Sequence, residues 1–207
     1  MRLALLLLVG CAANKAADDS ADPGPVWGDD YCQWILEDHA PASDAAALAD
    51  ALEIVRAALY PQLAANLVTL DPTDSDEDYF VSSVDLGEGS ASGDERVFLL
   101  RYSTLQFADP IPYSGLGAVL VHELKHAADF RDMSSEELVD FALWYAEGDY
   151  ASYEHDTDDA VLEAGCGQGL IDFRLWLYDH VDAETLIEKQ RDYYTPEEIA
   201  AWMEANP

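Results

Sequence analysis

The sequence predicts an α+β domain, with one small sheet in its first half and only helices in its second half. Two stretches, 79–84 and 96–102, are rich in β-branched and aromatic residues, and a loop of Gly and Ser separates them. From residue 114 onward, capping residues recur before segments with helical spacing of apolar side chains. Strands followed by helices are typical of α+β proteins rather than of alternating α/β folds.

Local signals set the expected helix boundaries. Ser43 can cap a helix over residues 44–60, where apolar side chains recur every three or four positions. Residues 63–70 fit either a short helix or a strand. In the second half, Thr157 begins a long helix that reaches about Tyr178. The other expected cap residues of that half are Ser114, Ser134, Asp182 and Thr195.

The composition indicates a folded and strongly acidic protein of one domain. The 207 residues include 42 Asp and Glu against 10 Lys and Arg, which gives a formal net charge of −32, and 50% of them are hydrophobic. That apolar content is enough for a buried core. A nucleic-acid partner is not expected, because phosphate backbones recruit clustered Lys and Arg. The charge favours cationic ligands, such as metal ions or basic peptides.

The N-terminus predicts secretion and a lipid anchor. One positive charge precedes an apolar run that is too short to span a bilayer but typical of a signal peptide. The run ends in Leu-Val-Gly-Cys at 8–11, which resembles the lipobox of bacterial lipoproteins. The resemblance implies a lipidated Cys11, the membrane as a partner, and a location in the bacterial cell envelope on its periplasmic or extracellular face. The chain then divides into a signal peptide, a flexible tether and one domain, over residues 1–10, 11–30 and 31–207.

Two further cysteines, Cys32 and Cys166, lie inside the expected domain. In an oxidising compartment they can pair and tie the start of the domain to a late helix. Two unpaired, buried thiols are the alternative, because the sequence does not give the distance between them.

One motif carries chemistry. Residues 122–126 have the form His-Glu-x-x-His within a segment that is predicted to be helical. Residues four apart lie on the same face of a helix, so the imidazoles of His122 and His126 can bind one ion. Zinc takes such nitrogen ligands and, in catalytic sites, keeps one position open for water. Glu123 lies about 100° around the helix, where it can accept a proton from that water as a general base.

This motif and its apolar lead-in, 115–121, resemble the active-site helix of the zincin metallopeptidases. The resemblance covers about residues 95–170. It implies Zn²⁺ as the cofactor and a zincin-like fold, in which the small sheet packs on the motif helix. It also implies an edge strand that binds substrate in extended form. Residues 96–102 are the candidate for that strand because they come directly before the helix.

The third zinc ligand has two main candidates. Metzincins continue the motif with a Gly and a third His, but residues 127–130 here are Ala-Ala-Asp-Phe, so the resemblance is to gluzincins, which take a Glu from a second helix. Glu163 is preferred because the small residues around it let its helix approach closely. Glu154 is the alternative. It has Asp158 four residues later, a spacing that gluzincins use to orient a ligand histidine, but it precedes the expected cap at Thr157.

Other groups are expected to support the site. With Glu163 as the ligand, either Asp129 or Asp159 would orient a histidine, and Asp159 is a further candidate for the third ligand itself. A Tyr or His is expected to polarise the substrate carbonyl. The downstream candidates for that role are Tyr153, His155, Tyr178 and His180.

The predicted function is a lipid-anchored, extracytoplasmic zinc metallopeptidase that hydrolyses a peptide or protein substrate, with a mild preference for basic ones. His122, His126 and Glu163, or Glu154 in its place, hold the zinc, and Glu123 activates water. One alternative is a zincin-like lipoprotein that binds metal or serves as a scaffold without cleaving. The other is a structural lipoprotein whose motif helix binds no metal.

Overall fold

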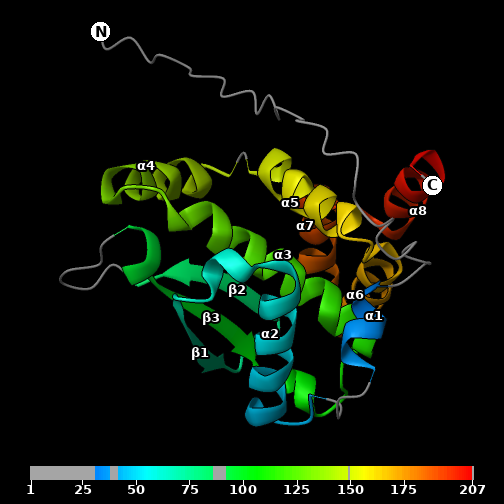
Figure 1. Cartoon of the computed structure of the whole chain (residues 1–207). Coiled ribbons are helices and arrows are strands. Elements are labelled where there is room, and N and C mark those ends of the chain that lie inside the picture. Colours follow the sequence, from blue (N-terminus) through cyan, green and yellow to red (C-terminus); the bar gives the residue numbers. More distant parts are fainter. Residues whose placement is uncertain (1–30, 38–41, 86–91, 149, 207) are drawn as a thin grey trace, which may run out of the picture.

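The computed structural model describes residues 31–37, 42–85, 92–148 and 150–206 (Figure 1). The expected signal peptide, Cys11 and the tether lie outside the described residues. A small sheet comes first and helices fill the second half, which confirms the α+β prediction. No helix in the described ranges combines the length and the apolar character needed to cross a membrane.

The sheet in the described chain is mixed and three-stranded, in the order β1-β3-β2. Its strands are β1 (Leu67–Thr73), β2 (Phe80–Val84) and β3 (Val97–Ser103), with short 3-10 turns η2 (Gly93–Glu95) and η3 (Thr104–Phe107) on either side of β3. β1 runs parallel to β3, and β2 runs antiparallel to it. The expectation that residues 96–102 form an edge strand is therefore wrong, because β1 and β2 cover both sides of β3.

Helices precede the sheet. They are α1 (Tyr31–Leu36), α2 (Ala45–Leu59) and the 3-10 turn η1 (Pro61–Leu63). α2 confirms the helix predicted over 44–60, but Asp44 caps it instead of Ser43. The Asp44 carboxylate accepts hydrogen bonds from the backbone amides of Ala46 and Ala47, both at 3.0 Å, and so satisfies two free donors of the first turn.

Six helices make up the second half of the described chain. They are α3 (Tyr113–Arg131), α4 (Ser135–Ala146), α5 (Ala151–Glu163), α6 (Gly167–His180), α7 (Ala183–Asp192) and α8 (Pro196–Ala205). The long helix expected to begin at Thr157 is in fact two helices, α5 and α6. The chain turns between them at Gly165, whose φ of 77° is in the left-handed region that favours glycine. α5 also begins earlier than predicted, so Thr157 lies inside it.

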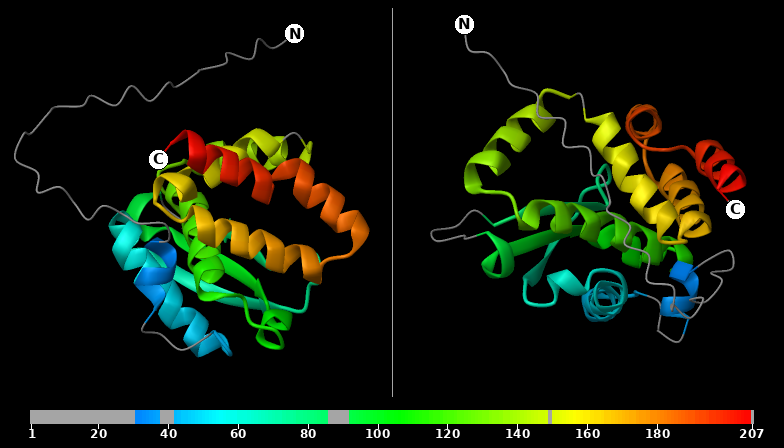
Figure 2. Two further views of the ribbon diagram at one scale, coloured as in Figure 1. Left: turned by 90° about the vertical axis from the view of Figure 1, so that its right-hand side faces the viewer. Right: turned by 45° about the horizontal axis from the view of Figure 1, so that its top comes forward.

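α3 is the central helix of the fold. It packs against β2, α1, α2, α5 and α6, and most of its residues are buried. Glycines allow this close packing: a Cβ on Gly169 of α6 would lie 2.4 Å from the Ser114 carbonyl oxygen, and one on Gly117 would lie 2.9 Å from the Cβ of Cys32. Figures 1 and 2 show α3 between the sheet and the helices of the second half.

A disulfide fixes the start of the domain beside α3. Cys32 of α1 and Cys166, just before α6, are bonded, with their Cα atoms 5.1 Å apart, so the cysteines pair and are not free thiols. The bond joins residues 134 positions apart in sequence. It therefore holds α1 and α6 together at the end of α3, and both helices contact α3.

Candidate metal centre

Two helices bring three potential metal ligands together. His122 and His126 lie one turn apart on α3, and Glu154 lies in the first turn of α5. All three are buried, with exposed fractions of 4%, 8% and 1%. The Nε2 atoms of the two histidines are 3.1 Å apart, and Glu154 Oε2 lies 3.1 Å from Nε2 of His122 and 3.4 Å from Nε2 of His126.

This triangle of donor atoms fits a tetrahedral zinc ion. Ligands at roughly 2.0–2.1 Å from a tetrahedral centre lie about 3.3–3.4 Å from one another, close to the three distances found here. Two imidazole nitrogens and one carboxylate oxygen are also a common donor set for catalytic zinc, which leaves a fourth position open. The donor set and its spacing therefore suit a divalent transition metal.

The structure places Glu154, the alternative candidate, beside the histidines, and it leaves Glu163 out. Glu163 is the exposed last residue of α5, nine positions after Glu154 and so about 13 Å further along the helix. The preference for Glu163 failed because α5 begins before Thr157. Glu154 therefore lies on a helix that packs on α3 and not on a loop.

A buried network orients His122. Its Nδ1 donates a hydrogen bond to Asp158 Oδ1 at 2.9 Å, and Asp158 is completely buried. Nη2 of Arg174 on α6 lies 2.9 and 3.0 Å from the two Asp158 oxygens, and the Tyr194 amide donates to Oδ2 at 3.1 Å. The orienting carboxylate is thus Asp158, neither Asp129 nor Asp159. It lies four residues after Glu154, the spacing noted in the sequence.

The same contacts set the protonation of this network. Burial raises the pKa of Asp158, but the Arg174 charge and the hydrogen bond from His122 outweigh it, so the net pKa is below its usual value. Burial lowers the pKa of the His122 imidazole, but hydrogen bonds with Asp158 and Glu154 outweigh it and raise that pKa to about 10. Without a metal, a proton therefore occupies the His122 Nε2 atom that a metal would need.

Two tyrosines hold the other ligands. His126 Nδ1 donates to the Tyr153 hydroxyl at 2.9 Å, and that hydroxyl donates to Asp129 at 3.4 Å. Tyr145 of α4 donates to Glu154 Oε1 at 2.7 Å, which leaves Oε2 directed at the histidines. Each of the three candidate ligands therefore has its second polar atom occupied by a neighbour, an arrangement that fixes ligand orientation in metal sites.

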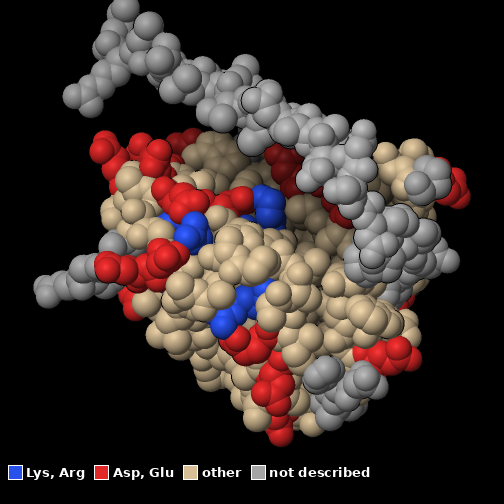
Figure 3. All heavy atoms as spheres, viewed as in Figure 1, with Lys and Arg blue, Asp and Glu red and all other residues tan. Residues whose placement is uncertain are grey.

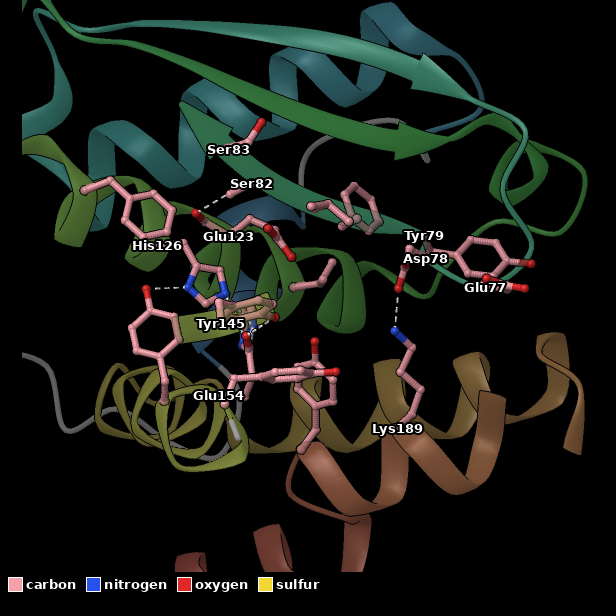
Figure 4. A pocket seen from close by; sticks show the side chains of 18 of the residues that line it. Glu77, Asp78, Tyr79, Ser82, Ser83, Glu123, His126, Tyr145, Glu154 and Lys189 are labelled. Atoms are coloured by element: carbon pink, nitrogen blue, oxygen red, sulfur yellow. Dashed lines mark hydrogen bonds and ion pairs between the residues drawn. The ribbon is translucent and has the colours of Figure 1, made fainter. Parts of the chain in front are cut away.

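Glu123 faces the same space without joining the triangle. Its side chain is 6% exposed, and its Oε2 has no hydrogen-bond partner among the described residues. An unpartnered, buried carboxylate oxygen is costly, which indicates a missing ligand or water beside it. The Glu123 carbonyl accepts a hydrogen bond from the Ser82 hydroxyl at 2.9 Å, so β2 is the strand tied to the motif helix (Figure 4).

The buried charges around the site do not balance. Glu123, Glu154 and Asp158 supply three negative charges, and Arg174 is the one buried cation among the described residues that line the cleft. When a metal takes the place of the His122 proton, both histidines are neutral and the excess is two negative charges, which a divalent cation would cancel. Asp and Glu side chains also cover more of the face drawn in Figure 3 than Lys and Arg do, and the formal net charge of −32 makes the field of the protein attractive to cations.

The candidate ligands line a cleft of about 530 Å³ between β2 and the helices of the second half (Figure 4). Aromatic side chains form much of its wall. They are Tyr79, Phe80, Phe130, Phe141, Tyr145, Tyr150, Tyr153, Phe173 and Tyr193. A largely apolar cleft with a few convergent polar groups is the usual form of a binding site for an organic ligand.

Of the residues expected to polarise a substrate carbonyl, only Tyr153 lines this cleft within the described chain. His155 stacks on Tyr194 with the ring centroids 4.3 Å apart, and His180 stacks on Trp176 at 4.1 Å. Tyr178 also does not line the cleft.

Sequence reasoning missed three residues of the cleft wall. Tyr193 lies with its ring 5.9 Å from that of His122, and Tyr145 and Arg174 contact the network around the ligands. The recurring tyrosines at 145, 150 and 153 were a signal in the sequence, but their contacts depend on how α4 and α5 pack.

Comparison with known proteins adds no relative. No family model, no curated protein and no solved structure matches the chain.

Proposed function

We propose that this protein is a zinc-dependent peptidase whose metal is held by His122, His126 and Glu154. The observation that supports it most is the convergence of two imidazole Nε2 atoms and one carboxylate oxygen, 3.1–3.4 Å apart, in a cleft that opens beside Glu123. A zincin-like fold of the gluzincin type is part of this proposal. It rests on the motif and on the spacing of Glu154 and Asp158.

Zinc, when bound, supplies a Lewis acid that makes water nucleophilic at neutral pH. The other steps belong to side chains of this chain. Glu123 accepts the proton of the attacking water at Oε2 and later delivers it to the leaving amine. Its lack of any other partner among the described residues leaves that oxygen available.

The aromatic cleft positions the substrate. Tyr193 lies beside His122 on the cleft wall and is our candidate for the donor that stabilises the developing oxyanion. The Arg174 guanidinium lies 4.8 Å above the centre of the Tyr193 ring and holds it in place. Tyr145 and Tyr153 instead orient the ligands Glu154 and His126.

We also propose that the protein is an envelope lipoprotein, anchored through a lipid on Cys11, with this domain outside the cytoplasm. The lipobox-like end of the N-terminal apolar run supports the anchor. The Cys32–Cys166 disulfide supports an oxidising compartment, where such bonds persist.

Replacing Glu123 by Gln tests the catalytic part of the proposal. The variant should keep one zinc per chain and lose hydrolysis of a mixed peptide library, because the amide cannot accept the proton. Glu163→Gln, a matched change on α5 outside the cleft, should leave both properties intact. Persistent hydrolysis by Glu123→Gln would refute its role as the base. Zinc binding without hydrolysis by the wild type would favour the alternative, a metal-binding scaffold.

A further inference from the structure

A second, smaller cavity adjoins the cleft. It has a volume of about 250 Å³, and five of the seven residues that line it are Asp or Glu. Glu77, Asp78 and Lys189 line both this cavity and the 530 Å³ cleft, so these three residues form the partition between them. The far wall of the smaller cavity comes from Asp182, Glu184, Thr185 and Glu188.

An ion pair joins two of these three residues. Nζ of Lys189 on α7 lies 2.6 Å from Oδ1 of Asp78, which comes just before β2, and the two residues are 111 positions apart in sequence. Figure 4 shows the Lys189 side chain rising from α7 to meet Asp78. Nζ also lies 5.6 Å from the centre of the Tyr193 ring, on the cleft wall. The pair therefore joins the strand side of the cleft to its helical side.

The position of this pair limits the length of the cleft. Ser82 marks the point where β2 is bonded to the motif helix, through the Glu123 carbonyl. Asp78 lies four residues earlier, roughly 13 Å along an extended chain. An extended peptide that passes the metal centre in this direction thus meets the ion pair after about four residues.

We propose that the Asp78–Lys189 pair is a gate that makes the cleft favour peptides that end before it over longer ones. With the gate closed, the cleft takes peptides that end within about four residues of the metal centre on that side. With the gate open, a longer chain passes into the smaller acidic cavity. This inference rests on the proposed peptide-binding role of the cleft.

The gate is weak enough to open. The Lys189 and Asp78 side chains are 17% and 53% exposed, and ion pairs that reach solvent in this way contribute little free energy. The penalty for a longer peptide is therefore at most about fivefold in affinity. Salt screens such a pair, so the penalty shrinks at high ionic strength.

Peptide binding tests the gate separately from catalysis. The full chain, kept metal-free with a chelator, is titrated calorimetrically with a capped hexapeptide of alanine and phenylalanine. Two further peptides carry four extra residues at the amino or at the carboxyl end. Extension at one end only should weaken binding to the wild type by about fivefold. Lys189→Ala should remove that penalty, and Lys189→Arg should retain it. Arg101→Ala, which removes an equal charge from an exposed pair on the sheet, should retain it as well.

Three results would overturn the gate: no penalty at either end, an equal penalty in Lys189→Ala and the wild type, or no binding of the hexapeptide. Zinc content and hydrolysis, measured on the same preparations, report on the proposed function instead. If the protein binds zinc and cleaves peptides but shows no end-specific penalty, the gate is refuted and the peptidase proposal stands. If the penalty disappears in Lys189→Ala but the protein binds no zinc, the gate is supported and the peptidase proposal is refuted.

Discussion

Zinc should displace one proton from His122, and this exchange can be measured. The pKa of that imidazole in the metal-free protein is about 10, because the hydrogen bonds with Asp158 and Glu154 outweigh its burial. At pH 8 the ring is therefore almost fully protonated, whereas a histidine of ordinary pKa would carry only a few hundredths of a proton. Zinc must replace that proton at Nε2.

The cost of the exchange follows from the same pKa. Because pH 7 lies about 3 units below this pKa, displacing the proton at pH 7 lowers the apparent zinc affinity by about 4 kcal/mol. The apparent zinc affinity should rise about tenfold per pH unit between pH 7 and pH 9. The stability of the metal-free protein has the opposite pH dependence. The stability that protonated His122 gives the metal-free protein is complete below about pH 6.5 and is lost as the pH rises towards 10.

Calorimetric titration with zinc at pH 8, in two buffers of different ionisation enthalpy, counts the protons released. Asp158→Asn removes one of the two carboxylates that raise the pKa of His122, so that pKa falls and zinc should release measurably fewer protons than from the wild type. Protons lost elsewhere in the site are common to both proteins, and the difference isolates His122. Asp159→Asn, a change on the same helix, should behave like the wild type. Equal proton release by all three proteins would refute the reasoning.

Three further predictions test the surroundings of the site. Arg174→Met should weaken zinc binding by roughly 10- to 100-fold in competition with a chelator, because Asp158 loses the partner that orients it, whereas Arg101→Met should not; equal effects would count against the network. Replacing both Cys32 and Cys166 by Ser should lower the free energy of unfolding by about 5 kcal/mol in a denaturant titration, as expected for opening a loop of 134 residues; a loss below 1 kcal/mol would argue against the bond. Cys11→Ser should abolish labelling with radioactive palmitate in a bacterial host and release the protein from membranes; unchanged labelling would contradict the anchor.

Local signals predicted much of the fold. The capping boxes at Ser134 and Thr195 begin α4 and α8 as expected, and the Asp182 carboxylate caps α7. These interactions form within one turn, so neighbouring residues determine them. Sheet order depends on pairing between distant segments. The 67–73 stretch contains Asp71 and Pro72 and gives no clear strand pattern, so its place beside β3 was not predictable.

The local part of the candidate site was also predictable from the sequence, and the part that depends on helix packing was not. The His122–Glu123–His126 motif is local, and the structure places all three side chains at one cleft. The third ligand depends on where α5 begins. Tyr150, the residue before that helix, makes no capping hydrogen bond with its side chain. Thr157 belongs to a residue type that favours helix caps, but it lies inside the helix. The spacing of Glu154 and Asp158 was the more informative signal, because it reflects the contact of α5 with α3.

Zinc content is the most direct test of the account. Purified protein, loaded with zinc and passed through a desalting column, should retain one zinc per chain when assayed by mass spectrometry. Glu154→Gln should retain far less, and Glu163→Gln should match the wild type, because only Glu154 lies beside His122 and His126. Retention of zinc by Glu154→Gln together with its loss from Glu163→Gln would contradict the assignment, and absence of zinc from the wild type would contradict the metal centre itself.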